Sequence, residues 1–309
     1  MITNSQLLAM IKLLDDTDQE VLDVVERKFI ELGSSIVPEL EQIWLNQEFP
    51  ELNPRIEIIL KNIQRQDLFQ SVHQWVESEN PDALTGWILA SRVQYPGLKY
   101  DSVKAQLNQL KIDAWVMLSG VHNPLDQIAI LNHIFFERNG YKGNNQNYHS
   151  PENSILPRVL ETKMGNPISL AILYLTVAQD LGIPVFGINL PQHFVLAYCK
   201  LKTQPNEFGI IPKNKLILSD FESVEFYFNP FSKGQIFNKE SIDAFLKVIK
   251  VIPQDNFYLP CSSMEIFKRI LRNLHYSYGE QQDFNKQNEV VELMKLVGLQ
   301  IHDDDFPEE

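Results

Sequence analysis

The stretch that decides the fold is KMGNPISLAILYLTVAQDLGIPVFGINLPQH, residues 163–193. Residues 167–181 are apolar on nearly every side, which predicts a buried helix with Asn166 as N-cap and Pro167 in its first turn. The Gly-Ile-Pro turn at 182–184 then leads to a short strand, and His193 opens the next strand. This order of helix, turn and strands predicts one compact unit that contains both the start of the helix and His193.

The composition is that of a globular protein that binds neither nucleic acid nor membrane. The chain has 309 residues, 44% of them hydrophobic and 22% charged, and this length suits two or three domains. The net charge of −13 disfavours nucleic acid and anionic lipid as partners, and no run of about 18 apolar residues predicts a membrane span. The acidic end after His302 is expected to be solvated.

The two cysteines, Cys199 and Cys261, give no disulfide framework and indicate a reducing compartment. The first residues lack the basic and then apolar pattern of a signal peptide. We therefore expect a cytoplasmic protein, in a bacterium or a similar cell.

The patterning predicts an α+β protein that is mostly helical. Amphipathic spacing predicts helices across residues 1–118. All four tryptophans lie in this part, which suggests a domain boundary at its end. The paired helices resemble a HEAT-like array, although the sequence has no clean internal repeat. Residues 119–252 predict a helical first half followed by a small antiparallel sheet, and residues 253–309 predict a closing helix pair. The expected strands are Pro184–Asn189, His193–Lys200, Lys215–Ser219 and Glu225–Phe228.

Residues 131–234 resemble the SirB-type branch of the transglutaminase-like superfamily. The resemblance is carried by LNHIFFERNGYKGN (131–144), SPENSILPRVLETKMGNPISLAILYL (150–175), LGIPVFGINLPQHF (181–194) and NPFSKGQIF (229–237). It implies a papain-like or transglutaminase-like core between helical arrays, with TPR-like helices at the C-terminus.

The resemblance also implies a degenerate triad. Active enzymes of the superfamily carry Gly-x-Cys, Gly-Ile-Pro, His and Asp in this order, and counting back from Gly182 puts the cysteine at Pro167. The histidine falls on His193 and the third member on Asn229. The branch shares the proline, but it usually keeps Asp before Pro-Phe and often has Arg a few residues after His, where this chain has Asn229 and Ala197. No residue is therefore expected to be catalytic with a cysteine mechanism.

Two other side chains are candidates for a replacement nucleophile, and neither fits. Ser169 is turned by roughly 200° from Pro167 around the helix, so a hydrogen bond to the backbone in the first turn is its expected role. Cys199 lies six residues along the strand from His193, about 20 Å away at about 3.3 Å per residue, and both cysteines are expected to be packed side chains.

A binding groove around His193 is the remaining functional expectation. Its candidate contacts, with a structural role as the alternative for each, are His193, Asn229, Tyr148, Asn153, Glu161 and Lys163. Asn229 can orient an imidazole or can form a turn before Pro230. No metal site or cofactor is expected: His133 and Glu137 are spaced as a surface pair, and no phosphate loop or dinucleotide motif is present.

Three functions follow from these residues. The favoured one is a non-catalytic scaffold or regulatory protein that binds a protein or peptide. A hydrolase of peptide or amide bonds, with His193 and Asn229 activating water, is the alternative from the enzyme class. The third is a domain kept only for stability.

Overall fold

The computed structural model describes residues 4–206 and 211–300. The chain divides into two compact units, Met1–Gln74 and Trp75–Glu309, and the division falls inside a long helix. The expected boundaries at 118 and 252 follow a different criterion, the composition of the sequence, and remain a prediction.

The first unit is helical. Its helices are α1 (Asn4–Lys12), α2 (Gln19–Leu32), α3 (Val37–Leu45) and the first part of α4 (Asn53–Glu77). One core joins them, with Ile11, Phe29, Leu40 and Ile56 fully buried. Gly33 ends α2 with a φ of 66°, a positive φ that glycine adopts at low cost.

The second unit is α+β and mostly helical, as expected. Its remaining helices are α5 (Ala83–Ser91), α6 (Tyr100–Leu118), α7 (Pro124–Asn132), α8 (Leu156–Thr162), α9 (Pro167–Asp180), α10 (Lys239–Val248), α11 (Ser263–Glu280) and α12 (Phe284–Leu296). Its strands are β1 (Lys142–Gly143), β2 (Met164–Gly165), β3 (Val185–Asn189), β4 (Phe194–Leu201), β5 (Phe221–Asn229) and β6 (Gln235–Phe237). Among the described residues, no helix has the length and hydrophobicity needed to cross a bilayer.

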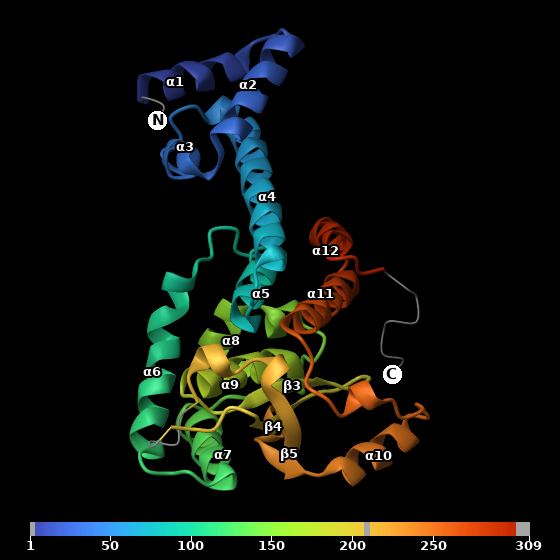
Figure 1. The fold of residues 1–309 in the computed structure, drawn as a ribbon. Helices are drawn as coiled ribbons and strands as arrows, with labels where there is room; N and C mark the ends of the chain where they lie inside the picture. The colour runs from blue at the N-terminus through green and yellow to red at the C-terminus, as the bar shows by residue number, and fades with distance from the viewer. Residues whose placement is uncertain (1–3, 207–210, 301–309) are drawn as a thin grey trace. The chain divides into compact units, whose positions relative to one another are not determined.

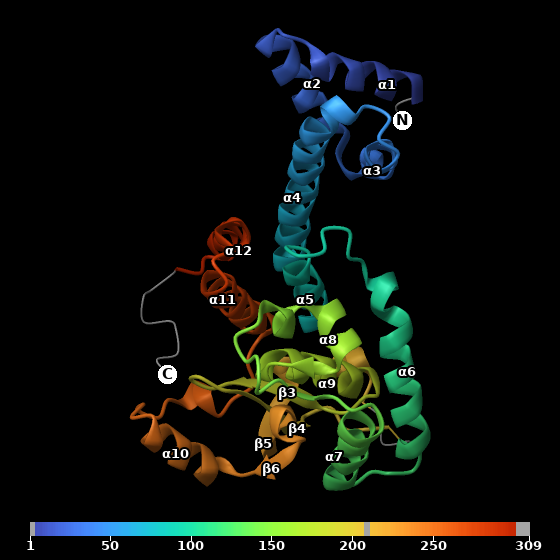
Figure 2. The same ribbon diagram turned by 180° about the vertical axis from the view of Figure 1, so that it is seen from behind.

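An antiparallel sheet with the order β3-β4-β5-β6 lies between two helical layers. Helix α9 packs against β3 and β4, while α10 covers the opposite face (Figures 1 and 2). The side chains of β4 alternate between the two faces of the sheet, and Val195, Ala197 and Cys199 belong to the core under α10. Leu196, opposite Phe228, faces α9, where the ring of Phe228 meets Tyr174 with centroids 5.2 Å apart.

The expected strand Lys215–Ser219 is wrong. Lys215 ends one 3-10 turn, Lys213–Lys215, and Leu218 begins another, Leu218–Asp220, with two residues of irregular backbone between them. Strand β4 ends at Leu201, which pairs with Phe221, so the chain before β5 has no strand beside it among the described residues. Strand β6 was not expected, because three residues after a tight turn carry too little periodicity.

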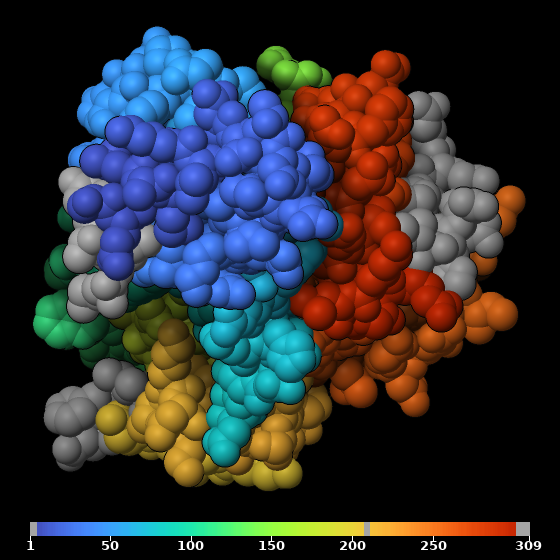
Figure 3. Space-filling view, turned by 90° about the horizontal axis from the view of Figure 1, so that it is seen from above, coloured from blue at the N-terminus to red at the C-terminus, as the bar shows by residue number. Residues whose placement is uncertain are grey.

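The closing helix pair is present as α11 and α12, and α11 packs against α5, α9 and β3. A complete capping box starts α11, in which Ser262 accepts a hydrogen bond from the Glu265 amide and Glu265 accepts one from the Ser262 amide. Figure 3 shows the outer surface of α11 and α12 as one continuous block, coloured red. The pair therefore belongs to the unit that contains the sheet.

Candidate functional site

The start of α9 is built by Asn166 and Pro167. The side chain of Asn166 accepts a hydrogen bond from the Ser169 amide at 3.0 Å, and Pro167 occupies the first turn, where a missing N–H is tolerated. Ser169 is buried, and its hydroxyl donates to the Asn166 carbonyl oxygen at 3.1 Å. This is the role expected for Ser169, and it keeps the hydroxyl inside the helix cap.

A cleft of ≈ 420 Å³ opens at this helix start. We call it the Pro167 cleft. Four segments line it: the loop at 148–149, the first residues of α9, the β3–β4 turn and one face of α11. Its size is in the range of small-ligand sites.

His193 is not among the residues that line the Pro167 cleft. Its ring stacks on Phe245 of α10, with centroids 4.7 Å apart and an angle of 20° between the planes. The residue is exposed overall, but one face of its ring packs on Phe245, and partial burial lowers the pKa of the imidazole. The charge of Arg269 lowers this pKa further, against a backbone hydrogen bond at Gln192 that raises it.

Gln192 occupies the place in the cleft that His193 was expected to hold. It lies in the β3–β4 turn with a φ of 58°, in the left-handed region, and it lines the cleft together with Pro191 and Phe194. The turn is closed by a hydrogen bond from the His193 amide to the Pro191 carbonyl oxygen at 2.7 Å. His193 faces α10, as Val195 does two residues later, whereas Gln192 lies in the turn before β4 begins.

Asn229 caps the turn after β5. Its side-chain oxygen accepts a hydrogen bond from the Phe231 amide at 3.0 Å, and its Nδ2 donates to the Ser232 hydroxyl at 3.3 Å. These contacts fit the turn role and leave no hydrogen bond to His193 among the described residues.

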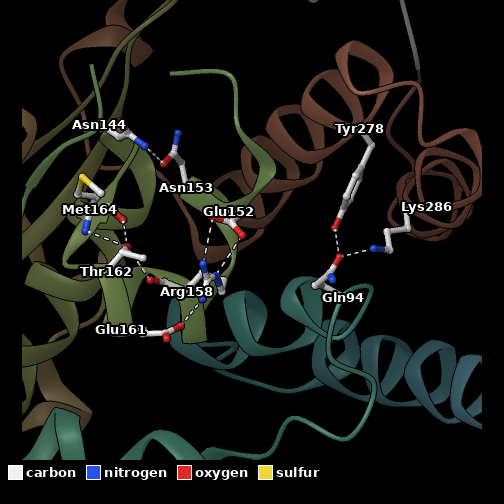
Figure 4. Close-up of polar contacts among 10 residues, drawn as sticks. All are labelled: Gln94, Asn144, Glu152, Asn153, Arg158, Glu161, Thr162, Met164, Tyr278 and Lys286. Atoms are coloured by element: carbon white, nitrogen blue, oxygen red, sulfur yellow. Dashed lines mark hydrogen bonds and ion pairs between the residues drawn. The ribbon is translucent and has the colours of Figure 1, made fainter. Parts of the chain in front are cut away.

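Asn153 is 2% exposed and organises the loop beside the cleft. Its Nδ2 donates to the carbonyl oxygens of Asn147 and Tyr148 at 2.6 and 2.9 Å. Its Oδ1 accepts a hydrogen bond from Asn144 at 2.9 Å, which Figure 4 shows. Its own carbonyl oxygen accepts from the Asn166 amide at 3.4 Å. Asn153 therefore ties the Tyr148 loop to the start of α9.

Tyr148 lines the cleft, whereas Glu161 and Lys163 do not. Tyr148 shares the cleft with Arg269; burial raises the pKa of Tyr148, and the charge of Arg269 lowers it. Glu161 forms an ion pair with Arg158 on the surface of α8 (Figure 4). Lys163 ends α8 with a φ of 61° and donates to the Tyr141 hydroxyl at 3.0 Å.

The remaining candidates are structural. Cys199 and Cys261 are buried, and burial raises the pKa of each thiol. His133 and Glu137 form the expected surface pair, with Nδ1 and Oε2 2.7 Å apart. Within residues 4–206 and 211–300, no three His, Cys, Asp or Glu side chains form a group that could hold a metal ion.

Sequence reasoning missed the contribution of α11. Arg269, Arg272, Asn273 and Tyr276 repeat at the spacing of one helical face and line the cleft. The signal in the sequence was two arginines on an otherwise amphipathic helix, but nothing in the spacing tied that helix to residues about eighty positions earlier.

The Pro167 cleft is cationic. Arg269 and Arg272 line it, and none of its described lining residues is Asp or Glu. Burial and the neighbouring Arg272 lower the pKa of Arg269 to about 10, so the group remains charged at neutral pH. The ring of His149 meets Tyr276 with centroids 5.1 Å apart, which links the Tyr148 loop to α11.

Comparison with known proteins fits this architecture. The transglutaminase-like superfamily matches residues 101–272, more than half of the chain. The chain belongs to this superfamily. The match covers α9, the whole sheet and the α11 residues up to Arg272, so the Pro167 cleft lies within the superfamily domain except for its last α11 contacts.

The relatives of this transglutaminase-like protein include bacterial and mammalian chains. A UPF0162 protein of Xylella fastidiosa (strain 9a5c) is 29% identical over 235 residues, which cover 72% of this chain and 74% of the relative. A UPF0162 protein of Vibrio cholerae is 28% identical over 113 residues, covering 37% of this chain and 34% of the relative. F-box only protein 21 of Mus musculus is 39% identical over 70 residues, which cover 23% of this chain and 11% of that protein. No solved structure matches the chain.

Proposed function

We propose that this transglutaminase-like protein is non-catalytic and binds a peptide, or a peptide segment of a protein, in the Pro167 cleft. One observation carries the proposal: Pro167, at the position of the superfamily's cysteine, lines the cleft without supplying a nucleophile, and His193 does not line the cleft. What the cleft offers instead is a set of amide, hydroxyl and guanidinium donors beside aromatic rings, which suits binding.

Placement in the SirB-type branch, with HEAT-like and TPR-like helices around the domain, is part of this proposal. Helical segments on both sides of a binding domain support a scaffold or regulatory role. The partner is a protein or peptide, and we expect neither a cofactor nor nucleic acid to take part.

Hydrolysis by His193 and Asn229 is the alternative, and we favour binding over it. General-base catalysis needs the imidazole within hydrogen-bond reach of the group it deprotonates. His193 stacks on Phe245 and does not line the cleft, and the Asn229 amide is used in its own turn.

The test is a pool of fluorescein-labelled random hexapeptides, with binding measured by anisotropy and cleavage by mass spectrometry. We expect the wild-type protein to bind a subset of the pool without cleaving it. Asn273→Trp fills the cleft from α11 and should weaken binding at least about tenfold, since it blocks the contact area on which affinity depends. Lys268→Trp is the matched control, because it puts the same indole on the same helix at a position that does not line the cleft. Cleavage that disappears in His193→Ala would favour the hydrolase instead.

A further inference from the structure

Arg269 is held in a fixed orientation at the edge of the Pro167 cleft. Its Nη1 donates to the side-chain oxygen of Asn189 at 2.9 Å and to the Leu190 carbonyl oxygen at 2.6 Å. Both acceptors lie at the end of β3, so the plane of the guanidinium is set by the sheet. An arginine oriented in this way loses little further freedom when it binds a ligand.

The opposite edge of the same guanidinium has open donors. Nε and Nη2 make no hydrogen bond to any group of residues 4–206 and 211–300. These two nitrogens form the side-on edge that pairs with both oxygens of a carboxylate through two parallel hydrogen bonds.

The charge of Arg269 is also without an anionic partner in the part of the chain that the structure describes. Its two hydrogen-bond acceptors are neutral, and the cation that acts on its pKa is Arg272, which has the same sign. The chain as a whole carries −13, so a cleft with no Asp or Glu among its described lining residues is a local exception. An anion bound there would lower the repulsion between the two arginines.

The start of α9 also favours an anion in the Pro167 cleft. Ile168 carries the first N–H of the helix, because Pro167 has none, and Ile168 lines the cleft. A helix N-terminus carries partial positive charge and favours an anion. Beside these donors stand the rings of Tyr148, Tyr276 and Phe194, which suit an apolar side chain next to the anion.

We infer that the Pro167 cleft recognises a carboxylate of its peptide ligand, with Arg269 as the anchoring cation and the aromatic wall holding the neighbouring side chain. The inference rests on the proposed peptide binding and adds the chemistry that selects the peptide. The carboxylate can belong to the last residue of the peptide or to an acidic side chain.

Three forms of each hexapeptide that binds test the inference by anisotropy with the full-length chain. The first has a free C-terminal acid and no acidic side chain, the second has a C-terminal amide and no acidic side chain, and the third has a C-terminal amide and one Glu. We expect the neutral amide to bind at least about tenfold more weakly than the better acidic form, as loss of charge-assisted hydrogen bonds implies. Preference for the first form identifies a chain terminus, and preference for the third identifies a side chain.

Variants assign the effect to Arg269. Arg269→Gln should remove the preference for the acidic form, while Arg269→Lys should keep part of it because the charge remains but the planar edge is lost. Lys268→Gln, which removes the same charge from the same helix outside the cleft, should leave the preference intact. The comparison of peptide forms needs only the wild-type protein, so a variant that fails to fold does not block the test.

The outcomes separate the two proposals. Equal affinity for all three forms overturns carboxylate recognition and leaves peptide binding in place. No binding by any hexapeptide overturns peptide binding, and carboxylate recognition falls with it. A preference for acidic forms that survives Arg269→Gln overturns the role given to Arg269.

Discussion

The imidazole of His193 stacks on the ring of Phe245, while the neighbouring Gln192 lines the Pro167 cleft. The residue that corresponds to a catalytic histidine by sequence resemblance is thus turned toward α10, and a carboxamide takes the place beside the helix start. Four predictions follow from this arrangement and from the contacts that support it.

Phe245→Ala should raise the pKa of His193 toward its ordinary value, because loss of solvent at the ring is the main cause of its lowered pKa. The lowered pKa of His193 also sets how the stability of the protein changes with pH. The unfolded chain binds a proton at this histidine more readily than the folded chain, so stability is full above about pH 6.5 and falls as the pH drops through the folded pKa. NMR titration of His193 and urea unfolding at several pH values give the two measurements. Phe245→Leu is the control, and a pKa unchanged in Phe245→Ala would contradict the assignment.

Pro167→Cys should create a reactive thiol but no hydrolase. A cysteine at a helix N-terminus has a lowered pKa, so alkylation by iodoacetamide near neutral pH should be fast. The wild-type chain provides the background, since Cys199 and Cys261 are buried with raised pKa values. We expect no peptide cleavage by mass spectrometry, because His193 does not line the cleft. Cleavage that requires both the introduced thiol and His193 would mean that the imidazole reaches the cleft.

Asn153→Ala should destabilise the second unit by about 2–4 kcal/mol, because three side-chain hydrogen bonds are lost and two carbonyl groups of the Tyr148 loop lose their donor. Asn144→Ala removes one of these three bonds, together with the bond that its own Oδ1 accepts from the Asn147 amide, and should cost about 1–2 kcal/mol. Urea unfolding monitored by tryptophan fluorescence measures both. Equal effects of the two substitutions would show that Asn153 does not organise the loop.

Gly187→Ala should destabilise the protein by about 1–3 kcal/mol through overpacking. A Cβ at this position of β3 would lie 2.6 Å from Cζ of Phe194, one of the residues that line the cleft. Phe194→Leu in the same chain should recover part of the loss, which a double-mutant cycle measures. At Gly97 an added Cβ meets nothing within 4 Å, so Gly97→Ala should change the free energy of unfolding little.

The sequence was informative where the local pattern is strong. The apolar run after Asn166 and the Gly-Ile-Pro turn predicted α9 and β3 closely, since a cap, a buried helix and a turn are local signals. The pattern at Lys215–Ser219 looked equally apolar, but strand formation also needs a neighbouring strand, and β4 ends too early to provide one.

The residues of the Pro167 cleft were harder to predict from the sequence, because they come from segments that lie far apart along the chain. Tyr148 was expected at a groove and lines one, but Arg269 was not considered, since packing of α11 against α9 is a tertiary contact. The role of Asn153 was also open, because an asparagine in a polar loop gives no sign of how many backbone groups it will serve.

The left-handed conformation of Gln192 has a consequence for how such a site can change over time. The residue at this position must tolerate a positive φ, which glycine and asparagine adopt more readily than most residues, so few side chains suit the turn. The backbone of the β3–β4 turn therefore restricts which side chains can replace the carboxamide beside the helix start.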